Sequence, residues 1–131
     1  MEVGGGGDCF FRSISHQLYG NSGYHHAIRT VGVNYLANNP ERFIESIVDT
    51  TWPQYLSSMS MQGTWPNNVI IQAVADALNL KIYIIESNQN FREMTLVEPS
   101  NAIQNPQFIY IGHIGEMHCV YISYVMQSII K

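Results

Sequence analysis

The chain has 131 residues and a mass of 14.8 kDa, so we expect residues 1–131 to fold as a single domain. Hydrophobic residues make up 46% of the sequence and charged residues 12%, which excludes intrinsic disorder as the main description. The formal net charge is −4 and the six basic residues are scattered, so a nucleic-acid-binding surface is not expected. No apolar stretch reaches the roughly 18 residues that span a bilayer, and no secretory signal is visible.

Helical patterns fill the first two thirds of the chain. Apolar residues recur there every three or four positions, the spacing that places them on one face of a helix. The expected helices cover residues 10–20, residues 25–38, a segment after Pro40, residues 54–61, and a segment that begins with Asn67 or Asn68 as its N-cap. We expect Gly20 to end the first helix and Trp52-Pro53 to interrupt the pattern before the fourth.

The last third of the chain changes to short apolar, β-branched runs, which are typical of strands. The expected strands cover residues 81–85, 108–111 and 117–125, with one edge strand near residues 93–97. The four glycines at positions 4–7 are expected to form neither helix nor strand, and His113 is expected in a turn. The chain is therefore predicted to be an α/β (α+β) domain with a small, mostly antiparallel sheet flanked by helices.

The glycine run leads into Asp8-Cys9 at the start of the first expected helix. The positive end of a helix stabilises a thiolate, and helix-start cysteines have lowered pKa values. Backbone without Cβ atoms can also turn its N–H groups inward together, as an oxyanion hole requires. Cys9 is thus a candidate nucleophile. The alternative is an inert buried thiol preceded by a flexible linker, and a phosphate-binding loop is disfavoured because its Lys-Ser/Thr ending is missing.

A thiol hydrolase also needs a histidine, and the chain has five. His16 lies two turns beyond the cysteine on the same helix, roughly 10 Å along its axis, which is too far for a base. His25 and His26 are interpreted as first-turn residues of the second helix. His118 opens the final strand, a rigid position from which a base can face a helix-borne nucleophile. The alternative is that His118 is a partly exposed strand residue without a catalytic role.

Cys119 follows His118 directly, and consecutive strand side chains point to opposite faces. We therefore expect Cys119 to pack away from the cleft. Two cysteines are too few for a disulfide framework and lack the spacing of a zinc site, so no metal site is expected.

Four blocks of the sequence, in order, resemble the ovarian-tumour (OTU) family of cysteine proteases, most of which are deubiquitinases. The blocks are Gly-Asp-Cys-Phe-Phe-Arg-Ser at residues 7–13, closed by Gln17-Leu18-Tyr19-Gly20; His25-x-x-Ile28-Arg29, continued by Tyr35-Leu36 and Pro40-Glu41-x-Phe43; Gly63-Thr64-Trp65 before a helix; and His118 on a late strand. The resemblance spans nearly the whole chain.

The resemblance implies a papain-like OTU fold and hydrolysis of the isopeptide or peptide bond after the C-terminal Gly-Gly of ubiquitin or a ubiquitin-like modifier. It implies Cys9 as the nucleophile and His118 as the general base and then acid. The backbone N–H groups of Gly6, Gly7, Asp8 and Cys9 would hold the oxyanion.

Ubiquitin or a polyubiquitin chain is therefore the expected partner, with Trp65 as a substrate-contacting residue. The implied reaction needs no metal or cofactor. We expect a monomer in the cytoplasm, or in the host cytosol for a pathogen effector, that binds neither nucleic acid nor membranes.

The chain departs from the family pattern at the third member of the catalytic triad. Gly6 and Val120 stand where many OTU members have an acidic or amide side chain that orients the histidine. Glu116, which shares a strand face with His118 by the two-residue period, is the first candidate, and Glu2 or a backbone carbonyl is the alternative. If none of these serves, the chain is an OTU-like pseudoprotease that binds ubiquitin with little or no catalysis, or an interaction scaffold that does neither.

Overall fold

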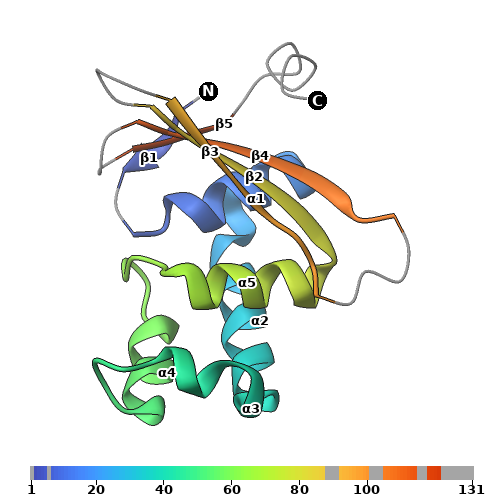
Figure 1. Cartoon of the computed structure of the whole chain (residues 1–131). Helices are drawn as coiled ribbons and strands as arrows, with labels where there is room; N and C mark the ends of the chain where they lie inside the picture. The colour runs from blue at the N-terminus through green and yellow to red at the C-terminus, as the bar shows by residue number, and fades with distance from the viewer. Residues whose placement is uncertain (1, 6, 88–91, 101–104, 115–117, 122–131) are drawn as a thin grey trace.

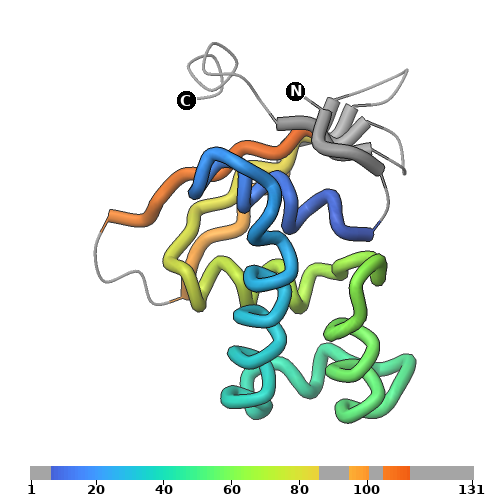
Figure 2. Tube along the Cα trace, turned by 180° about the vertical axis from the view of Figure 1, so that it is seen from behind, coloured from blue at the N-terminus to red at the C-terminus, as the bar shows by residue number. Residues whose placement is uncertain are grey.

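A computed structural model of the chain describes residues 2–5, 7–87, 92–100, 105–114 and 118–121, and for residues 2–5, 86, 87, 92–94, 113, 114 and 118–121 it describes the backbone alone. A twisted five-stranded sheet forms one end of the molecule and helices pack beneath one of its faces (Figure 1). The helix α2 runs away from the sheet toward α3 and α4 at the opposite end (Figure 2).

The helices largely follow the sequence pattern. They are α1 (Cys9–Tyr19), the 3₁₀ turn η1 (Ser22–Tyr24), α2 (His25–Asn38), α3 (Pro40–Phe43), the 3₁₀ turn η2 (Ile44–Ser46), α4 (Trp52–Ser60) and α5 (Asn68–Leu78). Gly20 ends α1 in the left-handed region, with φ of 81°, as a C-terminal glycine commonly does. Asn67 caps α5 by accepting from the backbone N–H groups of Val69 and Ile70.

The strands are β1 (Glu2–Gly5), β2 (Leu80–Ser87), β3 (Arg92–Val97), β4 (Gln107–Ile114) and β5 (His118–Tyr121). Their order in the sheet is β1-β5-β4-β2-β3, and only the β2–β4 pair is parallel. The prediction of a small, mostly antiparallel sheet in an α+β domain is confirmed, and β3 lies at an edge as expected.

Four sequence-based expectations were wrong. The glycine run contributes to a strand, β1, because residues 2–5 pair with β5. Glu2 pairs with Val120 and Gly5 pairs with His118, so three residues of advance along β1 correspond to two along β5. This extra residue is a β-bulge, a position that glycine favours. Trp52-Pro53 opens α4 instead of interrupting it, since proline is tolerated in the first helical turn. His113 belongs to β4, and the helix after Pro40 ends at Phe43 and continues as a 3₁₀ turn.

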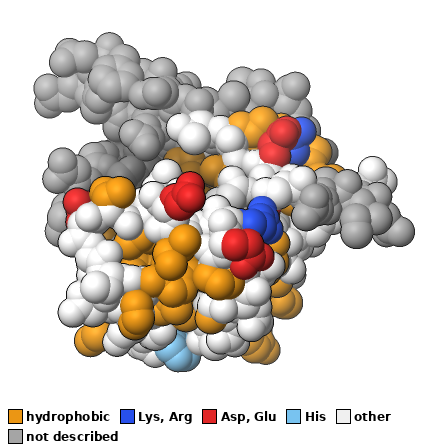
Figure 3. Space-filling model, turned by 60° about the horizontal axis from the view of Figure 1, so that its bottom comes forward, with side chains coloured by type: hydrophobic (Ala, Val, Ile, Leu, Met, Phe, Trp, Pro, Cys, Tyr) orange, Lys and Arg blue, Asp and Glu red, His pale blue; other side chains and the backbone are white. Residues whose placement is uncertain are grey.

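The core lies between the sheet and α1, α2 and α5. Its buried residues come from these three helices and from β2 and β4 of the sheet, among them Ile14, Leu36, Ile70, Ile82 and Ile109. Tyr110 of β4 lies beyond the part of that strand that pairs with β5, and Gln17 of α1 satisfies its backbone groups instead. The Gln17 side-chain amide donates to the Tyr110 carbonyl at 2.8 Å and accepts from the Tyr110 N–H at 2.9 Å. At the opposite end of the molecule, Ile44 and Val48 are exposed, and Figure 3 shows hydrophobic side chains gathered there among separate acidic ones.

Candidate active site

Cys9 is the first residue of α1, so the positive end of the helix dipole lies at its side chain. The residue is fully buried, and its sulfur is in a disulfide bond in this structure. Cys119, in β5, is the only other cysteine of the sequence. Because the thiolate is the nucleophilic form of cysteine, the chemistry predicted for Cys9 requires the reduced side chain.

Gly7 brings the loop before Cys9 into backbone contact with a second loop. A Cβ atom at Gly7 would lie 1.9 Å from the Gly63 carbonyl oxygen and 2.6 Å from the Thr64 carbonyl carbon. No side chain fits at such distances, so glycine is required here for close approach. The first and third blocks of the sequence motif are therefore in backbone contact.

Arg29 of α2 ties these two loops together from beneath. Its guanidinium is fully buried and lies over the Phe11 ring, 4.3 Å from the centroid. It bonds the Asp8 carboxylate at 2.8 Å. It also donates to three backbone carbonyls, those of Gly7 at 3.2 Å, Thr64 at 2.8 Å and Met59 at 2.9 Å. One side chain thus joins the nucleophile loop, the residue 63–65 loop and α4.

Asp8 also links the two loops, because its carboxylate binds both Arg29 and the residue 63–65 loop. Its Oδ1 accepts from the Gly63 backbone N–H at 3.0 Å as well as from Arg29. Burial raises the pKa of Asp8, but the Gly63 hydrogen bond and the Arg29 charge outweigh it, and the pKa lies below its ordinary value of 3.8. Asp8 is therefore ionised at neutral pH and forms a charge-assisted pair with Arg29.

His25, at the start of α2, is the titratable side chain that acts on Asp8 besides Arg29. Burial, followed by the nearby charge of Arg12, lowers the pKa of His25 below its ordinary value of 6.5. Its Nδ1 is buried without a hydrogen-bond partner among the described residues. His25 is thus neutral at pH 7, and its place in the first turn of α2 is as expected.

The strand that carries His118 borders the nucleophile loop. In the β1–β5 ladder, His118 pairs with Gly5, four residues before Cys9, and β5 packs against α1. The backbone of the predicted base is therefore next to the segment that leads to the predicted nucleophile. The side chain of His118 lies outside those described. The disulfide bond of Cys9 contradicts the expectation that Cys119 faces away from the cleft, because Cys119 is the only other cysteine of the sequence.

The other predicted site residues are distributed as follows. Gly6, one of the four predicted oxyanion donors, and Glu116, the first candidate for the third triad member, lie outside the described residues. Trp65 directly follows Thr64, and 42% of its surface is exposed beside the loop that Arg29 holds. Sequence reasoning did not assign Arg29 a role, although its position beside Ile28 on an otherwise apolar helix stripe was a signal of a buried, paired charge.

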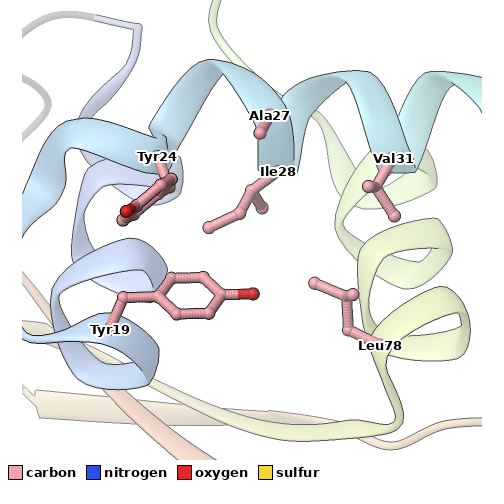
Figure 4. A pocket seen from close by; sticks show the side chains of 6 residues that line it. All are labelled: Tyr19, Tyr24, Ala27, Ile28, Val31 and Leu78. Atoms are coloured by element: carbon pink, nitrogen blue, oxygen red, sulfur yellow. The ribbon is translucent and has the colours of Figure 1, made fainter.

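A separate apolar pocket of about 330 Å³ lies where α1, α2 and α5 meet (Figure 4). It is lined by Tyr19, Tyr24, Ala27, Ile28, Val31 and Leu78. None of the predicted catalytic residues lines it, and it lacks an ionisable acid or base near neutral pH. Among the described residues, no group of three or more His, Cys, Asp or Glu side chains could hold a metal ion, and no helix is long and apolar enough to cross a membrane.

A cysteine at a helix start, a glycine-containing loop beside it and a neighbouring strand that carries a histidine form the arrangement of an α+β cysteine protease. The chain belongs to the OTU family: the family model described as "OTU-like cysteine protease" matches residues 4–121. The match contains both Cys9 and His118.

Known relatives agree with this assignment. The chain is 35% identical over 97 residues to OVARIAN TUMOR DOMAIN-containing deubiquitinating enzyme 9 of Arabidopsis thaliana, a match that covers 74% of this chain and 27% of that protein. The OTU domain of OTUD1 superimposes with a TM-score of 0.77 at 17% identity, covering 89% of this chain and 79% of that one. An OTU deubiquitinase from Wolbachia pipientis bound to ubiquitin superimposes with a TM-score of 0.62 at 16% identity, covering 88% and 91%. The chain spans 27% to 52% of the length of the first three curated relatives it matches.

Proposed function

We propose that this domain is a cysteine-dependent deubiquitinase that hydrolyses the isopeptide or peptide bond after the C-terminal Gly-Gly of ubiquitin or a ubiquitin-like modifier. The main structural support for this proposal is the loop of residues 7–9. It ends in a cysteine at a helix start, packs against the residue 63–65 loop and borders the strand of His118. Relatives named as deubiquitinating enzymes, and an OTU deubiquitinase bound to ubiquitin, support the choice of substrate.

In the proposed reaction, the Cys9 thiol loses its proton to His118 and attacks the carbonyl carbon of the terminal glycine of ubiquitin. The oxyanion of the tetrahedral intermediate accepts hydrogen bonds from backbone N–H groups of residues 6–9. His118 then protonates the leaving amine, and a thioester remains on Cys9. Water, deprotonated by His118, hydrolyses the thioester and restores both side chains.

Trp65 is proposed to contact the substrate next to this centre. Its exposed indole stands beside Thr64, whose carbonyl is fixed by Arg29. A large rigid side chain in that place offers apolar contact to an extended peptide tail at low entropic cost.

A ubiquitin probe with a C-terminal electrophile tests the proposal. We expect the reduced protein to form a covalent adduct that is lost in Cys9→Ala, and to cleave a fluorogenic ubiquitin amide. Cys9→Ala should keep its folding and its ubiquitin binding, because a small apolar group replaces a buried sulfur. Ubiquitin binding without adduct or turnover would instead identify a pseudoprotease, and the absence of all three would leave only a scaffold.

We propose a monomer that acts in the cytoplasm, where thiols stay reduced. The net charge of −4 and the scattered basic residues support partners other than nucleic acid. Light scattering of the purified protein checks the monomeric state, and a competition assay with duplex DNA checks the partner class.

A further inference from the structure

We propose that Arg29 and Asp8 are positioning residues that fix the nucleophile loop in its reactive conformation by binding it to the residue 63–65 loop. The inference rests on the proposed function for its kinetic test, but its geometry is independent of the substrate. Neither side chain is assigned contact with ubiquitin. Both act on the backbone of residues 7–9.

Arg29 holds the peptide unit between Gly7 and Asp8 in one orientation. Arg29 Nη2 donates to the Gly7 carbonyl at 3.2 Å. The C=O and N–H of a planar trans peptide point in opposite directions. The Asp8 N–H, a predicted oxyanion donor, therefore points away from Arg29. If the guanidinium is removed, the Gly7 carbonyl loses its buried partner and this peptide unit can rotate.

Asp8 and Arg29 also bind the opposing loop of residues 63–65. The Asp8 carboxylate accepts from the Gly63 N–H at 3.0 Å, while Arg29 donates to the Thr64 carbonyl at 2.8 Å. The same two side chains thus hold both loops, and they also hold each other at 2.8 Å. With Gly7 in backbone contact with residues 63 and 64, neither loop can shift alone.

Arg29 also offsets the negative charge of Asp8 beside Cys9. The Asp8 carboxylate is one residue from Cys9, and an unpaired carboxylate there would repel a thiolate. Arg29 pairs with it while fully buried, so the two charges largely offset each other at the sulfur. The remaining charged or titratable groups described around Asp8 are His25 of α2 and Arg12 of α1, which acts through His25.

The kinetic test compares Asp8→Asn and Arg29→Lys with the wild type on a fluorogenic ubiquitin amide. Asn keeps an oxygen for the Gly63 N–H, and Lys keeps a charge but cannot donate to four groups at once. Misplacement of a reacting group by about 1 Å costs on the order of 100-fold in rate. We expect kcat to fall about 10-fold to 100-fold in Arg29→Lys and less in Asp8→Asn, with KM changed less than about 3-fold.

A substrate-free test uses alkylation of the reduced Cys9 thiol by iodoacetamide as a function of pH, in variants that lack Cys119. Asp8→Asn leaves an unpaired cation and should move the midpoint to lower pH. Arg29→Gln leaves an unpaired carboxylate and should move it to higher pH. At an effective dielectric constant of about 20, a unit charge at a distance on the order of 10 Å shifts a pKa by on the order of 1 unit. The double variant Asp8→Asn/Arg29→Gln should return the midpoint toward that of the parent.

Another Asp–Arg pair among the described residues supplies the control. Arg42 bonds Asp76 at 2.7 Å between α3 and α5, and Asp76 is also almost fully buried. Arg42→Lys and Asp76→Asn should change thermal stability but neither kcat nor the alkylation midpoint. If Arg29→Gln fails to fold, Asp8→Asn alone decides the direction of the shift.

Shifts in the same direction for the two variants, or unchanged midpoints in folded proteins, would overturn the positioning role. If the wild type reacts with iodoacetamide as expected but does not process ubiquitin, the proposed function fails while the positioning inference stands. If ubiquitin is processed but the midpoints do not move in opposite directions, the positioning inference fails alone.

Discussion

Replacing Gly7 by alanine tests the contact between the two loops with the smallest possible change. The new Cβ would stand 1.9 Å from the Gly63 oxygen and 2.4 Å from its carbonyl carbon. Both neighbours are backbone atoms, so no side-chain rotation can relieve the overlap. The loops must separate by about 1 Å or more to restore an ordinary contact distance.

That separation stretches the 3.0 Å hydrogen bond from Gly63 to Asp8 beyond a useful length. Overpacking costs about 1 to 3 kcal/mol, and a hydrogen bond to a charged group contributes about 1.5 to 3 kcal/mol. We expect Gly7→Ala to lower the free energy of unfolding by about 3 to 5 kcal/mol, which corresponds to a fall in Tm of roughly 10 to 20 °C for a domain of this size. The displaced loop should lower kcat about 100-fold.

Thermal unfolding followed by circular dichroism and hydrolysis of a fluorogenic ubiquitin amide measure the two effects. Gly20→Ala is the matched control, because Gly20 has a φ of +81° but no atom within 4 Å of the position that a Cβ would occupy. It should cost about 1 to 2 kcal/mol through backbone strain alone and leave kcat unchanged. A Gly7→Ala protein with wild-type Tm and kcat would refute the backbone contact.

Three further predictions concern redox state, pH and substrate charge. Because Cys9 is disulfide-bonded, the oxidised protein should not react with the ubiquitin probe until a thiol reductant is added. Cys119→Ser should react without reductant. Equal labelling of the wild type with and without reductant would contradict this prediction. The pKa of His25 is lower in the folded protein than in the unfolded chain, so its contribution to stability is present above pH 6.5 and is lost as the pH falls below that value. His25→Gln should remove this part of the pH dependence of Tm. Neutralising the exposed acidic residues Glu41, Glu45 and Asp49, together with Glu116, should raise KM for a substrate with a basic ubiquitin tail. It should weaken the salt dependence of substrate association more than it lowers kcat. Wild-type kinetics across salt concentrations would contradict that role.

The elements predicted correctly are those whose signal is local. Helices α2 and α5 carry both their apolar stripe and their end signals within a few residues, as Asn67 shows by capping the first turn of α5. Strand β1 could not be predicted this way, because glycine has a low strand propensity and the segment is a strand only through pairing with β5. Its partner lies more than a hundred residues away in the sequence.

The same distinction applies to the site. The position of Cys9 at the start of α1 follows from residues that surround it in the sequence. The role of Arg29 does not, because its partners Asp8, Met59 and Thr64 lie 21, 30 and 35 residues away. A buried arginine on a helix signals that partners exist, but only the fold identifies them.

The identity of the third member of the triad, the group that orients His118, can be tested by substitution at Glu116. In Cys–His enzymes this group orients the imidazole and stabilises its cation, and activity can survive without it. If Glu116 has this role, Glu116→Gln should lower kcat about 10-fold to 1,000-fold, roughly 1.4 to 4 kcal/mol at about 1.36 kcal/mol per decade, with little change in KM. The pH–rate profile should shift as well, because His118 would lose a neighbouring negative charge.

Val120 offers the matched gain-of-function test. It lies two residues after His118 in β5, the spacing that places both on one face of the strand, and it pairs with Gly112 of β4 on one side and Glu2 of β1 on the other. If a backbone carbonyl or water orients the imidazole, Val120→Asn should raise kcat while Glu116→Gln leaves it unchanged. If Glu116 already orients the imidazole, Val120→Asn should add little. A silent Glu116→Gln beside a faster Val120→Asn would therefore exclude Glu116 and make the enzyme a Cys9–His118 dyad.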